Sequence, residues 1–173
     1  MLVAAFVVLI VFGVVWLSVR DQHPYVGPAG WALGVLYGTL AVWVVLTLVV
    51  RNRALQGVSG RSLQHGHLEG AAFGVIWASV YVFQGALAHA GASHAIAYGI
   101  YPAVAPLLIV GSAAAANQAA HRNWSWTGVA LGAVVLGAAA SFFGPRAVWG
   151  IISVGFCVLL VVRAAQSWWL QRR

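Results

Sequence analysis

The chain has 173 residues, of which 62% are hydrophobic and 6% are charged, and its nine arginines against two acidic residues give a net charge of +7. A soluble domain carries about 25% charged residues, so this composition excludes a water-exposed fold and predicts a chain solvated by lipid. The arginines lie between apolar runs, where they act as topology signals, so we expect no nucleic-acid binding.

Apolar runs of about 18 residues or more can span a membrane, because a helix rises about 1.5 Å per residue across a core of about 30 Å. In chain order, the sequence predicts spans at about 2–19, 29–50, 70–88, 95–116, 124–143 and 147–169. We therefore predict an all-α integral membrane protein, a compact bundle of six transmembrane helices forming one polytopic domain over residues 1–173. No basic residue precedes the first run, so we expect a retained helix there instead of a cleaved signal peptide.

The placement of the arginines predicts the orientation of the bundle, since basic residues accumulate in cytoplasmic loops. Two arginines, Arg20 and Arg146, fall on one side of the predicted membrane and seven fall on the other. The seven are Arg51, Arg53, Arg61, Arg122, Arg163, Arg172 and Arg173. This bias predicts that the N- and C-termini are both cytoplasmic.

The Ala-, Gly- and Val-rich composition without lysine suggests a bacterial source, and hence the bacterial plasma (inner) membrane.

Small and polar residues share one face of the third and fourth predicted spans. At about 100° per residue, the stripe on the third span comprises His67, Gly70, Gly74, Trp77, Tyr81, Gln84, Gly85 and Ala88. The face of the fourth span comprises His94, Tyr98, Tyr101, Ala105, Ser112 and Ala116. Pro102 and Pro106 interrupt that span, and carbonyls freed at such breaks can coordinate a substrate. We expect both stripes to face the inside of the bundle.

Two interpretations of these stripes stay open. One is packing, because polar side chains in lipid need partners on neighbouring helices. The other is a cavity between the third and fourth spans, lined by Trp77, Tyr81, Gln84, Tyr98 and Tyr101. Aromatic rings with a few polar groups suit a small amphipathic or lipid-like molecule better than a bare ion. The leading hypothesis is a small multi-pass membrane protein that binds or transports such a molecule through this cavity.

Two other functions remain as alternatives. A membrane-embedded enzyme acting on a lipid or isoprenoid would use His67 and Glu69 as acid–base groups, with Tyr81 and Gln84 nearby. A structural or accessory subunit would form a homo-oligomer or a larger membrane complex through its glycine-rich helix faces. Those faces are Gly34-xxx-Gly38, Gly70-xxx-Gly74 and Gly128-xxx-Gly132.

The histidines are the candidate metal ligands, and no cofactor is strongly implied. They divide into His23, His89 and His94 on the predicted outer side and His65, His67 and His121 on the inner side. None has a recognised metal-site spacing, although Asp21 and Glu69 lie near the two groups. Six helices with histidines on both sides resemble b-type cytochromes in architecture only, because no histidine lies deep in a predicted span.

Overall fold

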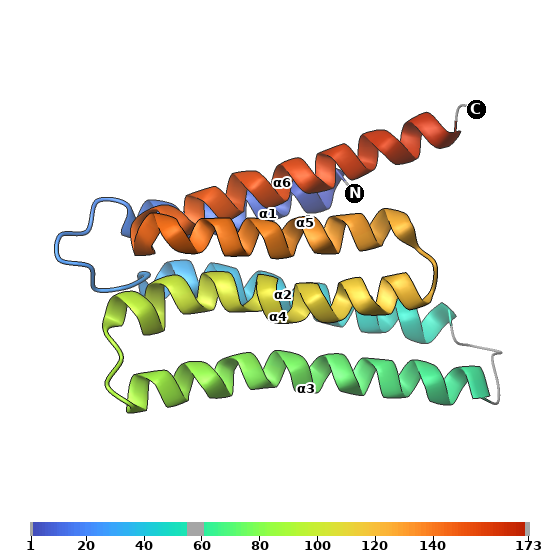
Figure 1. The fold of residues 1–173 in the computed structure, drawn as a ribbon, viewed down its shortest axis with the longest axis horizontal. Coiled ribbons are helices and arrows are strands. Elements are labelled where there is room, and N and C mark those ends of the chain that lie inside the picture. Colours follow the sequence, from blue (N-terminus) through green and yellow to red (C-terminus); the bar gives the residue numbers. More distant parts are fainter. Residues whose placement is uncertain (1, 55–60, 172–173) are drawn as a thin grey trace.

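The structure of the chain is helical. A computed structural model describes residues 2–54 and 61–171, while the side chains of 61–69 and of several residues in 44–54 and 170–171 lie outside the described part. In chain order its elements are α1 (Leu2–Val19), α2 (Gly30–Ala54), α3 (Arg61–His89), η1 (Ala95–Ile100), α4 (Tyr101–Ala120), α5 (Trp124–Ala140), η2 (Ser141–Phe143) and α6 (Gly144–Gln171). No strand occurs among these residues, so the predicted all-α class is confirmed (Figure 1).

Four stretches of the described chain are long and apolar enough to cross a membrane: Leu2–Val19, Gly70–His89, Ala95–Ala120 and Trp124–Trp169. The chain is therefore a helical membrane protein. The last stretch contains both α5 and α6. The chain reverses direction between these two helices at Gly144, which has a φ of 79° (Figure 1). A further apolar helix, Gly30–Trp43, is shorter. The prediction of six spans is thus met in part.

Several helices extend beyond the predicted spans. α2 continues to Ala54, and α3 begins at Arg61 instead of at about residue 70. A helix satisfies its own backbone hydrogen bonds, so it can continue into the membrane interface after the apolar run has ended. The stretch HGHLEG, residues 65–70, is consequently part of α3.

Two helix pairs form the centre of the bundle. α1 packs against α6, α4 packs against α5, and contacts between α5 and α6 join the two pairs. α2 packs on α1, whereas α3 lies at the edge of the bundle against α4 and η1 (Figure 1). The two ends of the chain lie toward the same end of the bundle, opposite the α1–α2 loop (Figure 1).

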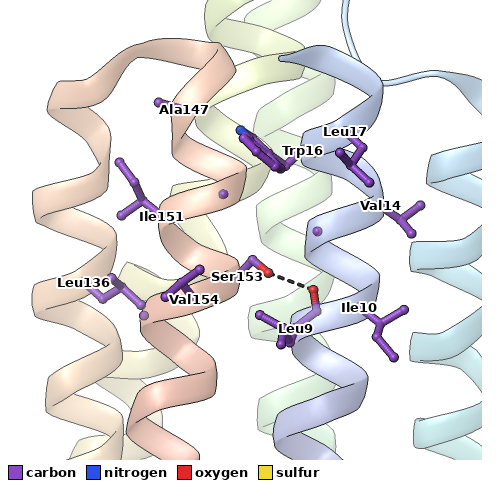
Figure 2. A pocket seen from close by; sticks show the side chains of 13 residues that line it. Leu9, Ile10, Val14, Trp16, Leu17, Leu136, Ala147, Ile151, Ser153 and Val154 are labelled. Atoms are coloured by element: carbon purple, nitrogen blue, oxygen red, sulfur yellow. Dashed lines mark hydrogen bonds between the residues drawn. The ribbon is translucent and has the colours of Figure 1, made fainter. Parts of the chain in front are cut away.

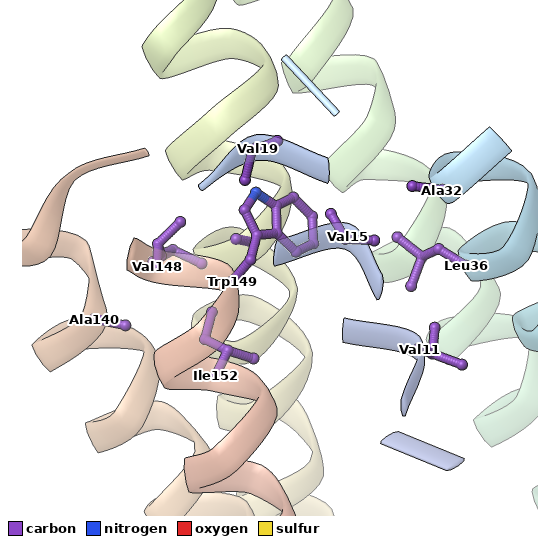
Figure 3. Packing of buried hydrophobic residues seen from close by; sticks show 11 residues of the cluster. Val11, Val15, Val19, Ala32, Leu36, Ala140, Val148, Trp149 and Ile152 are labelled. Carbon is purple, nitrogen blue, oxygen red and sulfur yellow. The ribbon is translucent and has the colours of Figure 1, made fainter. Parts of the chain in front are cut away.

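The hydrophobic core lies where α1, α4 and α6 meet, with a contribution from α2 (Figure 3). Trp149 is 1% exposed, and its ring centroid lies 6.0 Å from that of Phe12. The buried cluster consists of Val11, Val15, Val19, Ala32, Leu36, Ala103, Val104, Ala140, Val148, Trp149 and Ile152. Lipid tails are as apolar as these side chains, so close packing holds the helices together more than apolar burial does.

Close packing depends on glycines at the α4–α5 and α5–α6 contacts. A Cβ at Gly132 would lie 2.7 Å from Leu159 Cδ2, and one at Gly137 would lie 2.9 Å from Leu107 Cβ. By contrast, a Cβ at Gly34, Gly38, Gly74 or Gly128 would meet nothing within 4 Å. Among the described residues, therefore, Gly132 packs as predicted, whereas a Cβ at the other four of these glycines would meet no neighbouring helix.

The interior holds few polar groups. Among the described residues, the buried polar ones are Thr127 and Ser153. Thr127 Oγ1 donates to Asn123 O at 3.0 Å, and Ser153 Oγ donates to Leu9 O at 2.8 Å. Both hydroxyls are thus bonded to backbone carbonyls, and the second bond ties α6 to α1. The interior of the bundle is apolar and its buried hydroxyls are satisfied.

Candidate functional site

Three of the five predicted cavity residues, Trp77, Tyr81 and Tyr98, belong to two separate aromatic groups, and no ring contact involves Tyr101 among the described residues. Trp77 and Tyr81 stack on α3 with ring centroids 6.3 Å apart, and Tyr81 meets Tyr37 of α2 edge-on at 6.1 Å. Tyr98 lies beside His94, with centroids 5.5 Å apart. Tyr81 and Tyr98 are 39% and 40% exposed. A shared cavity between the third and fourth predicted spans stays a prediction.

The packing face of α3 differs from the predicted inward stripe. Val80 is 1% exposed, whereas Gly74, Tyr81 and Gly85 of the stripe are exposed. The partly buried residues on the side of Val80 are Phe73, Ile76, Trp77, Gln84 and Leu87. The packing face is thus rotated by roughly a quarter of a turn from the stripe, leaving Trp77 and Gln84 at its margin. Polarity alone did not identify this face, because apolar residues face lipid and neighbouring helices equally well.

Pro102 interrupts the backbone hydrogen bonds where η1 meets α4. η1 is a π-helix, and the Tyr101 N–H donates to Ile96 O, five residues earlier. The same pattern would pair an N–H at position 102 with Ala97 O, and an α-helical pattern would pair it with Tyr98 O. Proline has no N–H, so the carbonyl that would accept from position 102 loses its helical donor, whichever of the two patterns applies.

A side chain donates to each of these two carbonyls. Gln84 Nε2 of α3 donates to Ala97 O at 3.0 Å, and the Tyr25 hydroxyl donates to Tyr98 O at 3.4 Å. The carbonyls that the sequence offered as possible substrate ligands are therefore occupied by the protein itself. Gln84 lies at the α3–η1 contact as a packing partner, which is the first of the two interpretations of the stripe.

Tyr25 belongs to the loop between α1 and α2 and is held tightly against η1 and α6. Burial raises the pKa of Tyr25 to about 12, and the nearby indole N–H of Trp149 offsets part of this shift. That N–H makes no hydrogen bond of normal geometry and is buried. A Cβ at Gly99 would lie 2.9 Å from the Tyr25 hydroxyl, so only glycine fits beneath the ring.

The candidate metal ligands do not form a cluster where their side chains are described. No group of three His, Cys, Asp or Glu side chains in that part of the chain lies close enough to hold a metal ion. His23 Nε2 instead lies 3.1 Å from Arg146 Nη1. His65, His67 and Glu69, the predicted acid–base and inner metal residues, lie on the first turns of α3, and their side chains are outside the described part.

A groove between α1 and α6 is the concave surface that the structure adds to the sequence predictions (Figure 2). Its volume is about 950 Å³, and its lining is almost entirely aliphatic apart from Trp16 and Ser153. The lining consists of Leu9, Ile10, Gly13, Val14, Trp16, Leu17, Leu136, Ala147, Gly150, Ile151, Ser153, Val154 and Gly155. We call it the α1–α6 groove. The Ser153 hydroxyl is bonded to Leu9 O, so the groove offers apolar surface and few free donors.

Glycines shape the groove. A Cβ at Gly150 would lie 2.9 Å from Trp16 Cδ1, so the indole lies directly on the α6 backbone (Figure 2). A Cβ at Gly13 would lie 3.6 Å from Ser153 Oγ, which is ordinary contact and leaves open groove beyond it. Sequence reasoning treated 2–19 as an ordinary span and missed this site. Small residues at Gly13, Gly150 and Ser153 were the available signal, and their pairing required the helix register.

Charged residues lie at one end of the groove. The guanidinium carbon of Arg20 lies 5.4 Å from the centroid of the Trp16 ring. Arg20 Nε also donates to Asp21 Oδ2 at 2.9 Å, and the Arg20 side chain is 47% exposed. Arg146 directly precedes Ala147 of the groove lining. The groove is therefore apolar along its length and partly cationic at the end near the α1–α2 loop.

Comparison of the chain with protein families, with curated proteins and with solved structures found no match. Fold and composition place it in the class of helical membrane proteins.

Proposed function

We propose that the chain is a multi-pass membrane protein that binds an amphipathic, lipid-like molecule in the α1–α6 groove. The groove volume of about 950 Å³ carries this proposal. Ligand pockets usually measure about 300–1,000 Å³ and are lined mainly by apolar and aromatic side chains. An aliphatic or isoprenoid chain matches the lining better than a polar solute does, because Ser153 has its hydrogen bond within the protein.

The charged end of the groove favours an amphipathic molecule over a plain hydrocarbon. Arg20 lies over Trp16 at the end of α1 and is about half exposed, so it can contact a ligand head group. Arginine presents a planar fork of donors that suits phosphate and carboxylate groups. The ligand would place its apolar chain between α1 and α6 and an anionic head beside Arg20.

The largely apolar interior favours binding at the surface over passage through the bundle. The buried polar groups of the described core are few, and the hydroxyls of Thr127 and Ser153 are satisfied by backbone carbonyls. A polar conduit would need a series of accessible polar groups across the membrane. This observation supports a binding protein instead of a channel within one chain.

The proposed topology has six crossings with both termini cytoplasmic, in a bacterial plasma membrane. The reversal at Gly144 divides the stretch Trp124–Trp169 into two crossings, and α2 extends over Gly30–Ala54. Under this topology, the head group would lie in the outer leaflet beside Arg20.

The test compares Gly13→Leu with a matched control, Gly85→Leu. A leucine at position 13 would project into the groove, whereas Gly85 is exposed on α3 and has nothing within 4 Å of its Cβ position. Lipids retained by each purified variant would be extracted and measured per chain by mass spectrometry. We expect Gly13→Leu to retain at least about tenfold less of one apolar species, or about 1.4 kcal/mol, and Gly85→Leu to match the wild type.

Equal retention by both variants would refute the groove as the binding site. Loss in both variants would show that the bound lipid depends on the general lipid-facing surface. Arg20→Gln separates the two parts of the ligand, because it should weaken an anionic species and leave a neutral one unchanged.

An accessory subunit is the second candidate function. Gly34 and Gly38 of α2 are exposed and have no neighbour within 4 Å of a Cβ position, so this face is open to close approach by another helix. Native mass spectrometry of the same samples reports the number of chains. An oligomer that Gly34→Leu dissociates would support this function. The enzyme alternative with His67 and Glu69 stays a prediction.

A further inference from the structure

Arg163 is a charged residue within the apolar sequence of α6. Its Nε and Nη1 atoms are buried and have no hydrogen-bond partner. Its guanidinium carbon lies 5.7 Å from the centroid of the Trp126 ring on α5. The ring attracts the cation electrostatically, but it does not replace the oxygen acceptors that a guanidinium finds in water. Arg163 therefore retains unmet hydrogen-bonding capacity.

Among the described side chains, no carboxylate pairs with Arg163. The chain has two acidic residues, Asp21 and Glu69. Asp21 is paired with Arg20 at 2.9 Å in the loop region after α1. Glu69 belongs to α3, which is separated from α6 by the layer of α4 and α5 (Figure 1). An anion from outside the chain would supply the acceptors that Arg163 lacks among the described side chains.

The surroundings of Arg163 suit a lipid phosphate. Trp126 lies in the first turn of α5, and no side chain caps that helix at Asn123. The amino end of a helix carries a partial positive charge, which adds to the attraction for an anion. Exposed apolar side chains lie within five residues of Arg163, on faces of α6 turned by about 100–160° from it, and offer contact to acyl chains that pass around the helix, namely Val158, Val161 and Val162.

We propose that Arg163, supported by Trp126 and the start of α5, binds the phosphate of an anionic membrane lipid. The guanidinium fork donates to phosphoryl oxygens, and the acyl chains lie along the exposed valines of α6. A lipid fits better than a soluble phosphate, because the flanking surface is apolar. This site lies toward the carboxyl end of α6, away from the α1–α6 groove, and does not depend on the proposed function.

The experiment titrates the purified full-length chain with phosphatidylglycerol, phosphatidylcholine or inorganic phosphate and measures binding by native mass spectrometry. We expect the wild type to prefer phosphatidylglycerol over phosphatidylcholine by at least about tenfold. Arg163→Gln should remove most of this preference, and Arg163→Lys should keep part of it because the charge remains without the fork. Arg53→Gln is the control, because Arg53 is exposed near the end of α2 and belongs to neither α5 nor α6.

Each arm has an outcome that decides the proposal. A wild-type chain without preference for phosphatidylglycerol would overturn it, and this arm needs no variant to fold. Equal losses in Arg163→Gln and Arg53→Gln would overturn the proposal and assign the preference to general surface charge. Competition by millimolar inorganic phosphate as effective as that by the lipid would overturn the lipid assignment and indicate a soluble oxyanion.

Discussion

Gln84 and Pro102 form an unusual pair, since one side chain supplies the hydrogen bond that the other residue removes. Gln84 Nε2 donates to Ala97 O at 3.0 Å, and Ala97 is 0% exposed. Replacing Gln84 with leucine keeps a similar volume and removes the donor. The buried carbonyl then has no partner, and we expect the free energy of unfolding to fall by about 1–2 kcal/mol.

The matched experiment is a double-mutant cycle with Pro102→Ala. An alanine at position 102 restores a backbone N–H that can bond with Ala97 O or let η1 return to an α-helical pattern. In that background Gln84→Leu should cost about 0.5 kcal/mol or less, which gives a coupling energy of about 1 kcal/mol. Unfolding by SDS in mixed micelles, followed by circular dichroism, measures all four variants.

The coupling energy decides whether this reasoning is correct. If Gln84→Leu lowers the free energy of unfolding equally in the wild type and in the Pro102→Ala background, Gln84 acts through packing alone. An unchanged stability in the single variant would show that the Ala97 carbonyl finds another donor. Gln118→Leu on α4 serves as a control for replacing a partly buried glutamine without this partner.

Two further predictions concern packing and titration. Gly137→Ala should lower the free energy of unfolding by about 1–3 kcal/mol, because its Cβ would lie 2.9 Å from Leu107 Cβ at the α4–α5 contact and that atom cannot rotate away. The control is Gly128→Ala, which lies in open space on the same helix and should be neutral or slightly stabilising in the same SDS assay. Tyr25 should remain protonated at pH 11 in an ultraviolet titration compared with Tyr25→Phe, because its pKa is raised to about 12. Its contribution to stability is present below pH 10.0 and is lost as the pH rises toward 12, because the unfolded chain releases the proton first; a normal titration near 10 in the folded protein would contradict this.

Composition was sufficient to predict the helical class and the membrane environment, because few charges and long apolar runs leave no alternative solvent. It was not sufficient to predict which face of α3 packs. Gln84 turns toward η1 because Pro102 leaves a carbonyl there, whereas Tyr81 finds ring partners in Trp77 and Tyr37 and remains partly exposed. Each polar side chain thus follows a local partner, and a helical wheel carries no information about partners on other helices.

Glycine spacing likewise did not predict which helix faces pack. Gly34, Gly38 and Gly74 have the spacing of contact faces, yet no described atom of another helix lies within 4 Å of a Cβ built at any of them. Gly13 and Gly150 have no such motif, yet they shape the α1–α6 groove because α1 and α6 pack together in this register. A small residue permits close approach, and the partner's position decides whether approach occurs.

The satisfied polar groups restrict where an external molecule can be recognised. Pro102 pointed to η1 as a binding site, but Gln84 and Tyr25 occupy the carbonyls that it frees. A ligand at η1 would therefore have to displace hydrogen bonds that the fold already makes. In contrast, the α1–α6 groove offers apolar contact to a bound molecule. Arg163 offers two buried N–H groups that have no acceptor in the described part of the chain. A molecule that gains free energy from this protein without breaking existing bonds is thus an apolar chain, an anionic head group, or a lipid that combines the two.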